Sequence, residues 1–94
     1  MKLSDARKIF SELRKDGFII VYPHSYRDHK ERKFTEDEIK HLVIYANGFL
    51  SDNNYPSAIE GSFLFTCKDD FNRKVEIAVL LENKIIVVHA FRKV

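Results

Sequence analysis

The chain has 94 residues, 45% of them hydrophobic and 32% charged, and its net charge is +2. This composition indicates one globular domain, 1–94, and argues against a disordered chain; a membrane-spanning helix is excluded because no apolar run approaches the required ~20 residues. The lone cysteine, Cys67, excludes an intrachain disulfide. With no disulfide and no leader sequence evident, the expected location is the cytoplasm. The Cys67 side chain is expected to be buried as a small hydrophobic residue.

The charges are unevenly distributed along the chain. Residues 1–34 hold nine Lys and Arg against five Asp and Glu, a balance of +4, whereas residues 35–94 hold seven against nine, a balance of −2. A basic first third suits a polyanion such as RNA. Solvated helix faces give the same pattern, so both interpretations stay open.

Residues 4–16 are predicted to form a helix that Ser4 or Asp5 caps. Apolar residues recur there at helical spacing, namely Leu3, Ala6, Ile9, Phe10 and Leu13. Gly17 is expected to end this helix, because glycine readily adopts the left-handed conformation of a helix terminus. The apolar, β-branched run 18–22 then predicts a strand that Pro23 stops.

Two helical segments are predicted next. Residues 25–32 are expected to form a short helix or helical turn, and a longer helix begins at Thr35. There the Thr35 hydroxyl would accept from the Glu38 amide, while the Glu38 carboxylate reaches back to form a capping box. An apolar stripe follows, made of Ile39, Leu42, Val43 and Ala46. Gly48 is expected to end this helix.

The second half of the chain has the period of strands. A turn is expected at 52–54, a strand at 62–68 and a loop at 69–72. Residues 74–81 and 85–92 alternate and are joined by 82–84, which predicts a hairpin. The predicted fold is α+β, with an antiparallel sheet of about four strands packed on one face by two or three helices in the order α-β-α-α-β-β-β.

Strict alternation along the last strand assigns its side chains to two faces. Ile85, Val87, His89 and Phe91 would share one face, opposite Ile86, Val88, Ala90 and Arg92. His89 would then be either a core histidine or, near the end of the sheet, a functional group. Arg92 is a candidate phosphate ligand or part of a solvated tail.

The segment 24–34 is the densest polar cluster in the chain. His24 can move a proton, since the ordinary pKa of histidine is about 6.5, and Arg27 and Arg32 can hold a phosphate. Tyr26 can stack a base or orient a histidine. Alternatively, ion pairs such as Asp28 with Arg32 would make the segment a solvated surface helix.

The histidine and cysteine spacing fits no zinc motif, and the isolated glycines fit no phosphate-binding loop. No metal site and no cofactor are therefore expected.

The pattern H-x-x-R-x-x-x-x-R-K-F-T-E-D-E-I, which begins at His24, resembles the opening of a family of small bacterial RelE-superfamily domains of unknown function. Family members carry a histidine, an arginine three residues on, a second arginine and a capped helix start, and they close with a hairpin. The resemblance covers about residues 22–94. It implies a RelE/ParE-like fold, a small antitoxin-like protein partner and the activity of toxins that cut messenger RNA.

By this resemblance the chain is a candidate metal-independent endoribonuclease in which the 2′-hydroxyl of RNA attacks the phosphate. His24 and His89 would transfer the protons, while Arg27, Arg32 and Arg92 would hold phosphate and Tyr26 would contact RNA. Catalysis itself stays open at this point. The chain departs from the family in its N-terminal helix and in offering one histidine where the last strand of the toxins carries a row of Arg, Lys and Tyr.

Two other functions fit the same residues. A non-catalytic module could bind RNA or a protein through the basic segment without any proton transfer. Alternatively, the chain could be an interaction protein that forms a homodimer through residues 85–88, if they make an exposed apolar edge.

Overall fold

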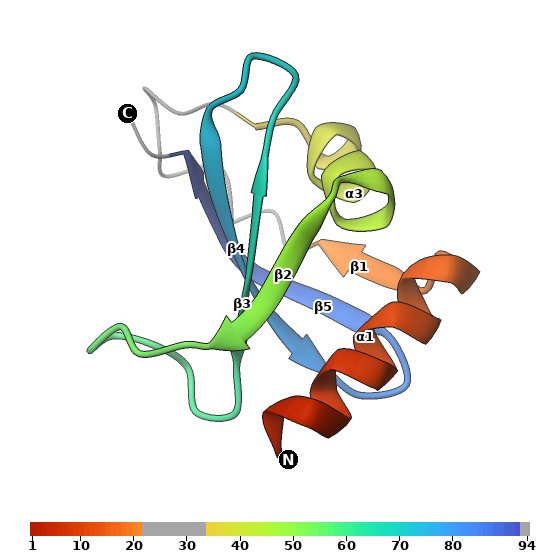
Figure 1. The fold of residues 1–94 in the computed structure, drawn as a ribbon, viewed down its shortest axis with the longest axis vertical. Helices are drawn as coiled ribbons and strands as arrows, with labels where there is room; N and C mark the ends of the chain where they lie inside the picture. Colours follow the sequence, from red (N-terminus) through yellow and green to blue (C-terminus); the bar gives the residue numbers. More distant parts are fainter. Residues whose placement is uncertain (22–33, 93–94) are drawn as a thin grey trace.

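The computed structural model describes residues 1–21 and 34–92 (Figure 1). The described elements in chain order are α1 (Leu3–Asp16), β1 (Ile19–Val21), α3 (Glu36–Tyr45), β2 (Gly48–Asp52), β3 (Phe63–Lys68), β4 (Lys74–Leu81) and β5 (Ile85–Arg92). The α+β class is therefore confirmed. Neither described helix is long and apolar enough to cross a membrane.

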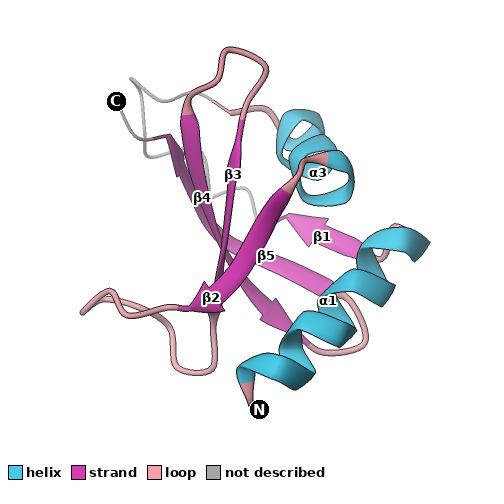
Figure 2. Ribbon diagram, in the orientation of Figure 1, coloured by secondary structure: helices cyan, strands magenta, loops and turns pink. Residues whose placement is uncertain are grey.

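The strands form one sheet in the order β1-β5-β4-β3-β2. The strands β3, β4 and β5 are antiparallel neighbours, as predicted. The strand β2, which the sequence analysis did not predict, joins β3 in antiparallel fashion. At the other edge β1 pairs with β5 in parallel, from Ile19 beside Ile85 to Val21 beside Val87. The prediction of about four antiparallel strands was therefore wrong in two respects, because the described sheet has five strands and is mixed. The two described helices, α1 and α3, lie on the same face of this sheet (Figure 2).

The last strand is an interior strand, flanked by β1 and β4. The predicted exposed edge at 85–88 is thus wrong, and with it the homodimer contact that depended on that edge. Pairing at this edge places Val21, with Ile19 beside it, in the core on the helix side of the sheet. The amide of Ile85 also donates to the Phe18 carbonyl at 2.7 Å, which continues the pairing beyond β1.

Helix α1 ends as predicted and begins differently. Gly17 has φ +71°, and the amide of Phe18 donates to the Leu13 carbonyl at 3.1 Å, so the left-handed glycine closes the helix. At the other end, Lys2 is the N-cap and makes no side-chain capping bond. The prediction of Ser4 or Asp5 as cap was wrong, because both residues already lie within the first turn.

Helix α3 begins at the predicted cap, where the Thr35 hydroxyl accepts from the Glu38 amide at 3.1 Å. Its other end differs from prediction, since the helix stops at Tyr45 and Gly48 begins β2. A Cβ built at Gly48 would lie 2.3 Å from the Thr66 carbonyl oxygen. Glycine is needed there for close approach of two strands, and the prediction that it ends the helix was wrong.

A β-bulge divides β5 into two halves. Ala78 pairs with His89 whereas Val79 pairs with Val87, so Val88 is the additional residue. Directly opposed residues share a face, and the helix-side core therefore contains Ile85, Val87 and Ala90. His89 and Phe91 lie on the other face. The prediction that they share a face with Ile85 and Val87 was wrong because strict alternation does not cross a bulge.

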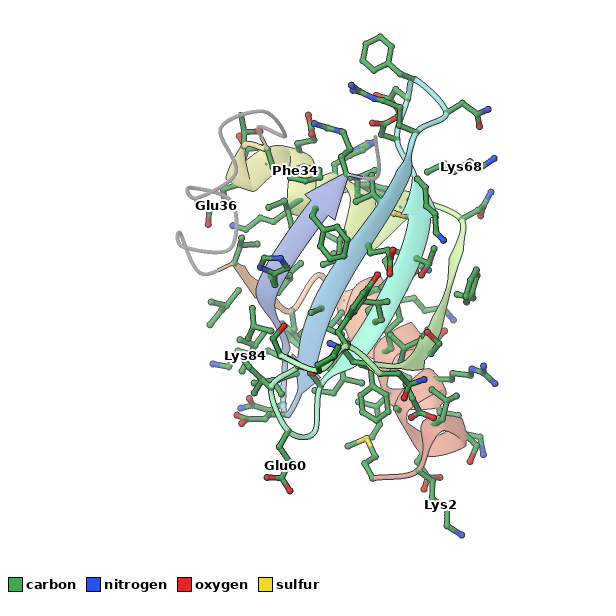
Figure 3. All side chains as sticks on the ribbon, turned by 90° about the vertical axis from the view of Figure 1, so that its left-hand side faces the viewer. Lys2, Phe34, Glu36, Glu60, Lys68 and Lys84 are labelled. Carbon is green, nitrogen blue, oxygen red and sulfur yellow. The ribbon has the colours of Figure 1, made fainter. Side chains whose placement is uncertain are left out.

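The core lies mainly between the helices and the sheet. Its members include Phe10 from α1, Ile39 and Val43 from α3, and Phe65 and Ile77 from the sheet. A smaller apolar cluster of Leu64, Ala78, Ile86 and Val88 forms on the opposite face. We call this opposite side of the sheet the cavity face; Figure 3 looks onto it, with the helices behind the strands.

The close approach at Gly48 gives a direct test of the β2–β3 pairing. Gly48→Ala should lower the free energy of unfolding by about 1–3 kcal/mol, because the added methyl group must push the Thr66 backbone away. Urea denaturation measures this loss. Ser51→Ala in the same strand is the control, with an expected change within about 0.5 kcal/mol. Equal stability of Gly48→Ala and wild type would contradict the pairing.

Candidate functional site

A cavity of about 480 Å³ opens on the cavity face, between the sheet and the loop that joins β2 to β3. The loop contributes Asn53, Tyr55, Ser57, Ala58 and Ile59. The strands contribute Leu64, Ala78, Val88, His89 and Phe91. We call it the sheet-face cavity. Its floor is apolar, its walls include two aromatic rings and an imidazole, and its rim carries amide and hydroxyl groups.

Hydrogen bonds close the loop at its base, and one side chain ties the loop to the sheet. The Asn53 amide nitrogen donates to the Ser62 hydroxyl at 3.1 Å, and that hydroxyl donates to the Ile59 carbonyl at 2.6 Å. The Tyr55 hydroxyl donates to the Glu76 carboxylate and lies 3.1 Å from each of its oxygens. This last contact fixes the tyrosine ring as a wall of the cavity.

Glu76 is the unusual residue of β4. Its neighbours in the strand are apolar, yet this carboxylate is only 4% exposed and lies on the cavity face. A buried carboxylate is costly unless it is hydrogen-bonded, and the Tyr55 hydroxyl supplies one such bond. Glu76 therefore couples the loop to the sheet through a charged hydrogen bond.

His89 lies in the cavity wall and is half-buried. Its ring centroid is 5.3 Å from that of Phe91, which in turn makes an edge contact with Tyr55 at 5.8 Å. Ala78 lies directly opposite His89, and Glu76 lies opposite Phe91, so His89 and Glu76 are diagonal neighbours. Such neighbours are about 7–8 Å apart. The cavity thus holds an imidazole beside aromatic surface, near a carboxylate.

Arg92 lies on the helix face of β5, opposite to His89, and it is buried. Its Nε donates to Asp69 at 2.8 Å, its Nη2 contacts the Glu38 carboxylate, and its guanidinium lies 4.2 Å from the Phe34 ring centroid. Phe34 lies near the arrowhead of β5 in Figure 3. The Glu38 carboxylate, expected to complete a capping box with Thr35, is directed to Arg92 instead.

Asp69 is the centre of this ion-pair cluster, and its side chain is 5% exposed. Its oxygens accept from the amides of Phe71 and Arg73 at 2.9 Å, and from the guanidinium groups of Arg73 and Arg92. Burial alone would raise the pKa of Asp69, but these hydrogen bonds outweigh it and lower the pKa. The cluster joins the β3–β4 turn, the end of β5 and the start of α3.

Two arginines of the basic first third bind the protein's own backbone. Arg14 donates to the carbonyls of Val43 at 2.9 Å and Ala46 at 2.6 Å, which satisfies the C-terminal end of α3. Arg7 donates to the Leu50 carbonyl at 3.2 Å. These two charges therefore stabilise the fold, and part of the basic balance of residues 1–34 is explained without a polyanion.

Cys67 is buried, as expected. Burial raises the pKa of its thiol to about 11, more than the nearby Arg14 lowers it, so the thiol is protonated at neutral pH. A protonated, buried thiol is a poor nucleophile.

The predicted site residues divide into two groups. His24, Tyr26, Arg27 and Arg32 lie outside the described residues, as does the predicted helix over 25–32. Of the remaining two, His89 lies in the sheet-face cavity and Arg92 in the buried ion-pair cluster, on opposite faces of β5. The structure thus separates these two residues.

The sequence analysis missed Tyr55, Glu76 and Phe91 as residues of the site. One signal was present, because Glu76 interrupts an apolar strand at a position whose neighbours, Val75 and Ile77, face the core. A lone carboxylate in such a run indicates that the second face of the strand carries polar chemistry. Tyr55 gave no comparable signal, since its contact with Glu76 crosses 21 residues of sequence.

Across residues 1–21 and 34–92, no three His, Cys, Asp or Glu side chains gather in a way that could hold a metal ion. No known protein family, curated protein or solved structure matches this chain.

The Asp69 cluster predicts a specific dependence of stability on pH. Because folding lowers the pKa of Asp69, its ionised form stabilises the fold above the ordinary value of 3.8, and this contribution is lost as the pH falls through the lower folded pKa. Asp69→Asn should lower the free energy of unfolding at pH 7 by about 1–3 kcal/mol, since an amide nitrogen cannot accept these hydrogen bonds. Urea denaturation from pH 7 to pH 2 measures both effects.

The difference in free energy of unfolding between wild type and Asp69→Asn should shrink as the pH falls below 3.8, because Asp69 then becomes protonated in the unfolded chain before it does in the folded protein. Asp70→Asn changes the exposed neighbouring carboxylate and should match wild type throughout. If the free energies of unfolding of wild type and Asp69→Asn differed by the same amount at every pH, the charge of Asp69 would not be the source of its stabilising effect.

Proposed function

We propose that the protein is a metal-independent endoribonuclease that cleaves RNA beside the sheet-face cavity, with His89 as a proton-transfer group. The observation that supports this most is the position of the imidazole, half-buried in a cavity wall next to the Phe91 and Tyr55 rings. Aromatic rings stack RNA bases, and an imidazole can give or take a proton near neutral pH. The resemblance of residues 22–94 to RelE-like toxins favours the same activity.

The reaction needs two proton transfers. The 2′-hydroxyl loses its proton as its oxygen bonds to phosphorus, the bond from phosphorus to the 5′-oxygen breaks, and that leaving oxygen takes a proton. The products are a 2′,3′-cyclic phosphate and a 5′-hydroxyl. We assign one transfer to His89 and the other to His24, with Tyr26, Arg27 and Arg32 contacting the RNA; these last four residues stay predictions from the sequence.

The RelE/ParE-like assignment belongs to this proposal as well. It is supported by the antiparallel run β2–β5 packed on one face by helices, and it carries with it a small antitoxin-like protein partner. A substrate of cellular RNA favours a cytoplasmic location.

A second candidate is an RNA-binding module without catalysis. The state of Arg92 favours it, because its guanidinium already contacts the Asp69 and Glu38 carboxylates and its side chain is only 10% exposed. An arginine held in this way is poorly placed to stabilise charge on a reacting phosphate, and it acts first as part of the fold.

His89→Gln should reduce single-turnover cleavage of a single-stranded RNA by at least about 100-fold, the usual contribution of a general acid or base. The assay contains a chelator, and a second substrate carries deoxyribose at the cleaved position. That substrate should resist cleavage because it lacks the attacking hydroxyl. His41→Gln is the matched control, since His41 is exposed on α3.

Cleavage that is unchanged in His89→Gln would contradict the role of His89. If wild type binds the RNA but does not cut it, the second candidate function is correct and the first is wrong. His24→Gln in the same assay tests the other proton-transfer assignment.

A further inference from the structure

We infer that the sheet-face cavity binds one unpaired base of single-stranded RNA, and that this contact fixes where the chain engages its substrate. The inference rests on the proposed function in one respect, which is that RNA supplies the base. It goes beyond the proposed function because it concerns recognition, and it holds whether or not the RNA is cut.

The cavity is large enough to hold a nucleobase. Its volume of about 480 Å³ lies within the range of about 300–1,000 Å³ that is usual for small-molecule sites. It is bounded on one side by the sheet and on the other by the loop over residues 53–62. A base that is still paired and stacked in a duplex cannot enter such a space, so the base must be unstacked and turned out of its strand.

The chemistry of the walls matches the two parts of a nucleobase. The floor of Leu64, Ala78 and Val88 is apolar and excludes water from the face of a ring. Phe91 and Tyr55 offer aromatic surface, which binds any base through its π face. At the rim, the Ser57 hydroxyl can hydrogen-bond the edge of a base. The Asn53 amide, which already bonds the Ser62 hydroxyl and the Tyr55 amide, has one further donor and lone pair to offer.

The aromatic walls are held in place before any ligand arrives. The Tyr55 hydroxyl donates to both oxygens of the buried Glu76 carboxylate, so its ring cannot rotate away without losing a charged hydrogen bond. Phe91 projects from an interior strand and contacts both Tyr55 and His89. A preformed stacking site loses little conformational entropy on binding.

The test uses a short single-stranded oligonucleotide whose 2′-oxygens are methylated, so that binding is measured without cleavage. A series of otherwise identical oligonucleotides, each lacking the base at a different position, is prepared for comparison. Fluorescence anisotropy measures the affinity of the protein for each one. Removal of the base at one position should weaken binding by wild type about tenfold or more, the loss of one base–aromatic stack. Removal of a base at any other position should weaken binding by a smaller factor.

Phe91→Leu should weaken binding of the intact oligonucleotide by a similar factor, and the missing base should then cost no further affinity. Phe49→Leu is the matched control, since Phe49 is 61% exposed on β2 and outside the cavity lining. If Phe91→Leu does not fold, Ala58→Phe fills the cavity from its loop and should have the same effect on binding.

Equal affinity of wild type for all the oligonucleotides with a missing base would overturn the inference, as would equal affinity for a duplex. Tight binding of adenosine monophosphate alone, matching the oligonucleotide, would assign the cavity to a free nucleotide instead. The proposed function fails separately: base-dependent binding without cleavage removes the ribonuclease, and cleavage without base dependence removes only this inference.

Discussion

The bulge at Val88 is the constraint on which the arrangement of β5 depends. It directs Ala90 and Arg92 to the helices and His89 and Phe91 to the cavity face. With regular pairing, the imidazole would lie in the main core and the guanidinium would lie on the other face. A bulge is a common device for re-aiming side chains beside a site, and here it separates residues that stabilise the fold from residues that can meet a ligand.

The two faces of the sheet consequently use their charges in different ways. On the helix face, Arg14 and Arg92 bind carbonyls and carboxylates of the protein itself and join separate elements. On the cavity face, the buried Glu76 carboxylate holds Tyr55 and so shapes a cavity wall. The first group adds contacts between elements in a small domain with a modest core, and the second holds the β2–β3 loop in place as a cavity wall.

The sequence predicted the features that depend on local pattern, such as the Thr35 cap, the Gly17 terminus and the hairpin of β4 and β5. It did not predict features set by distant contacts. Local pattern assigns Gly48 to the end of a helix, whereas its role is set by the Thr66 carbonyl of the neighbouring strand. The face of the sheet on which His89 lies depends on a bulge, which the alternation of residues in the sequence does not reveal. The parallel pairing of β1 likewise joins residues more than 60 positions apart, from Ile19 with Ile85 to Val21 with Val87. Of the side chains around the cavity, the sequence analysis had singled out His89 as a candidate, and it had missed Tyr55, Glu76 and Phe91.

Cross-strand nuclear Overhauser effects in the isotopically labelled protein test the bulge directly. The pairing described here predicts backbone proton contacts between Ala78 and His89 and between Ile77 and Ala90 on one side of the bulge, and between Val79 and Val87 on the other. Contacts between Ala78 and Val88, and between Ile77 and His89, would indicate regular pairing. That result would move His89 away from the sheet-face cavity and contradict both proposals that depend on it.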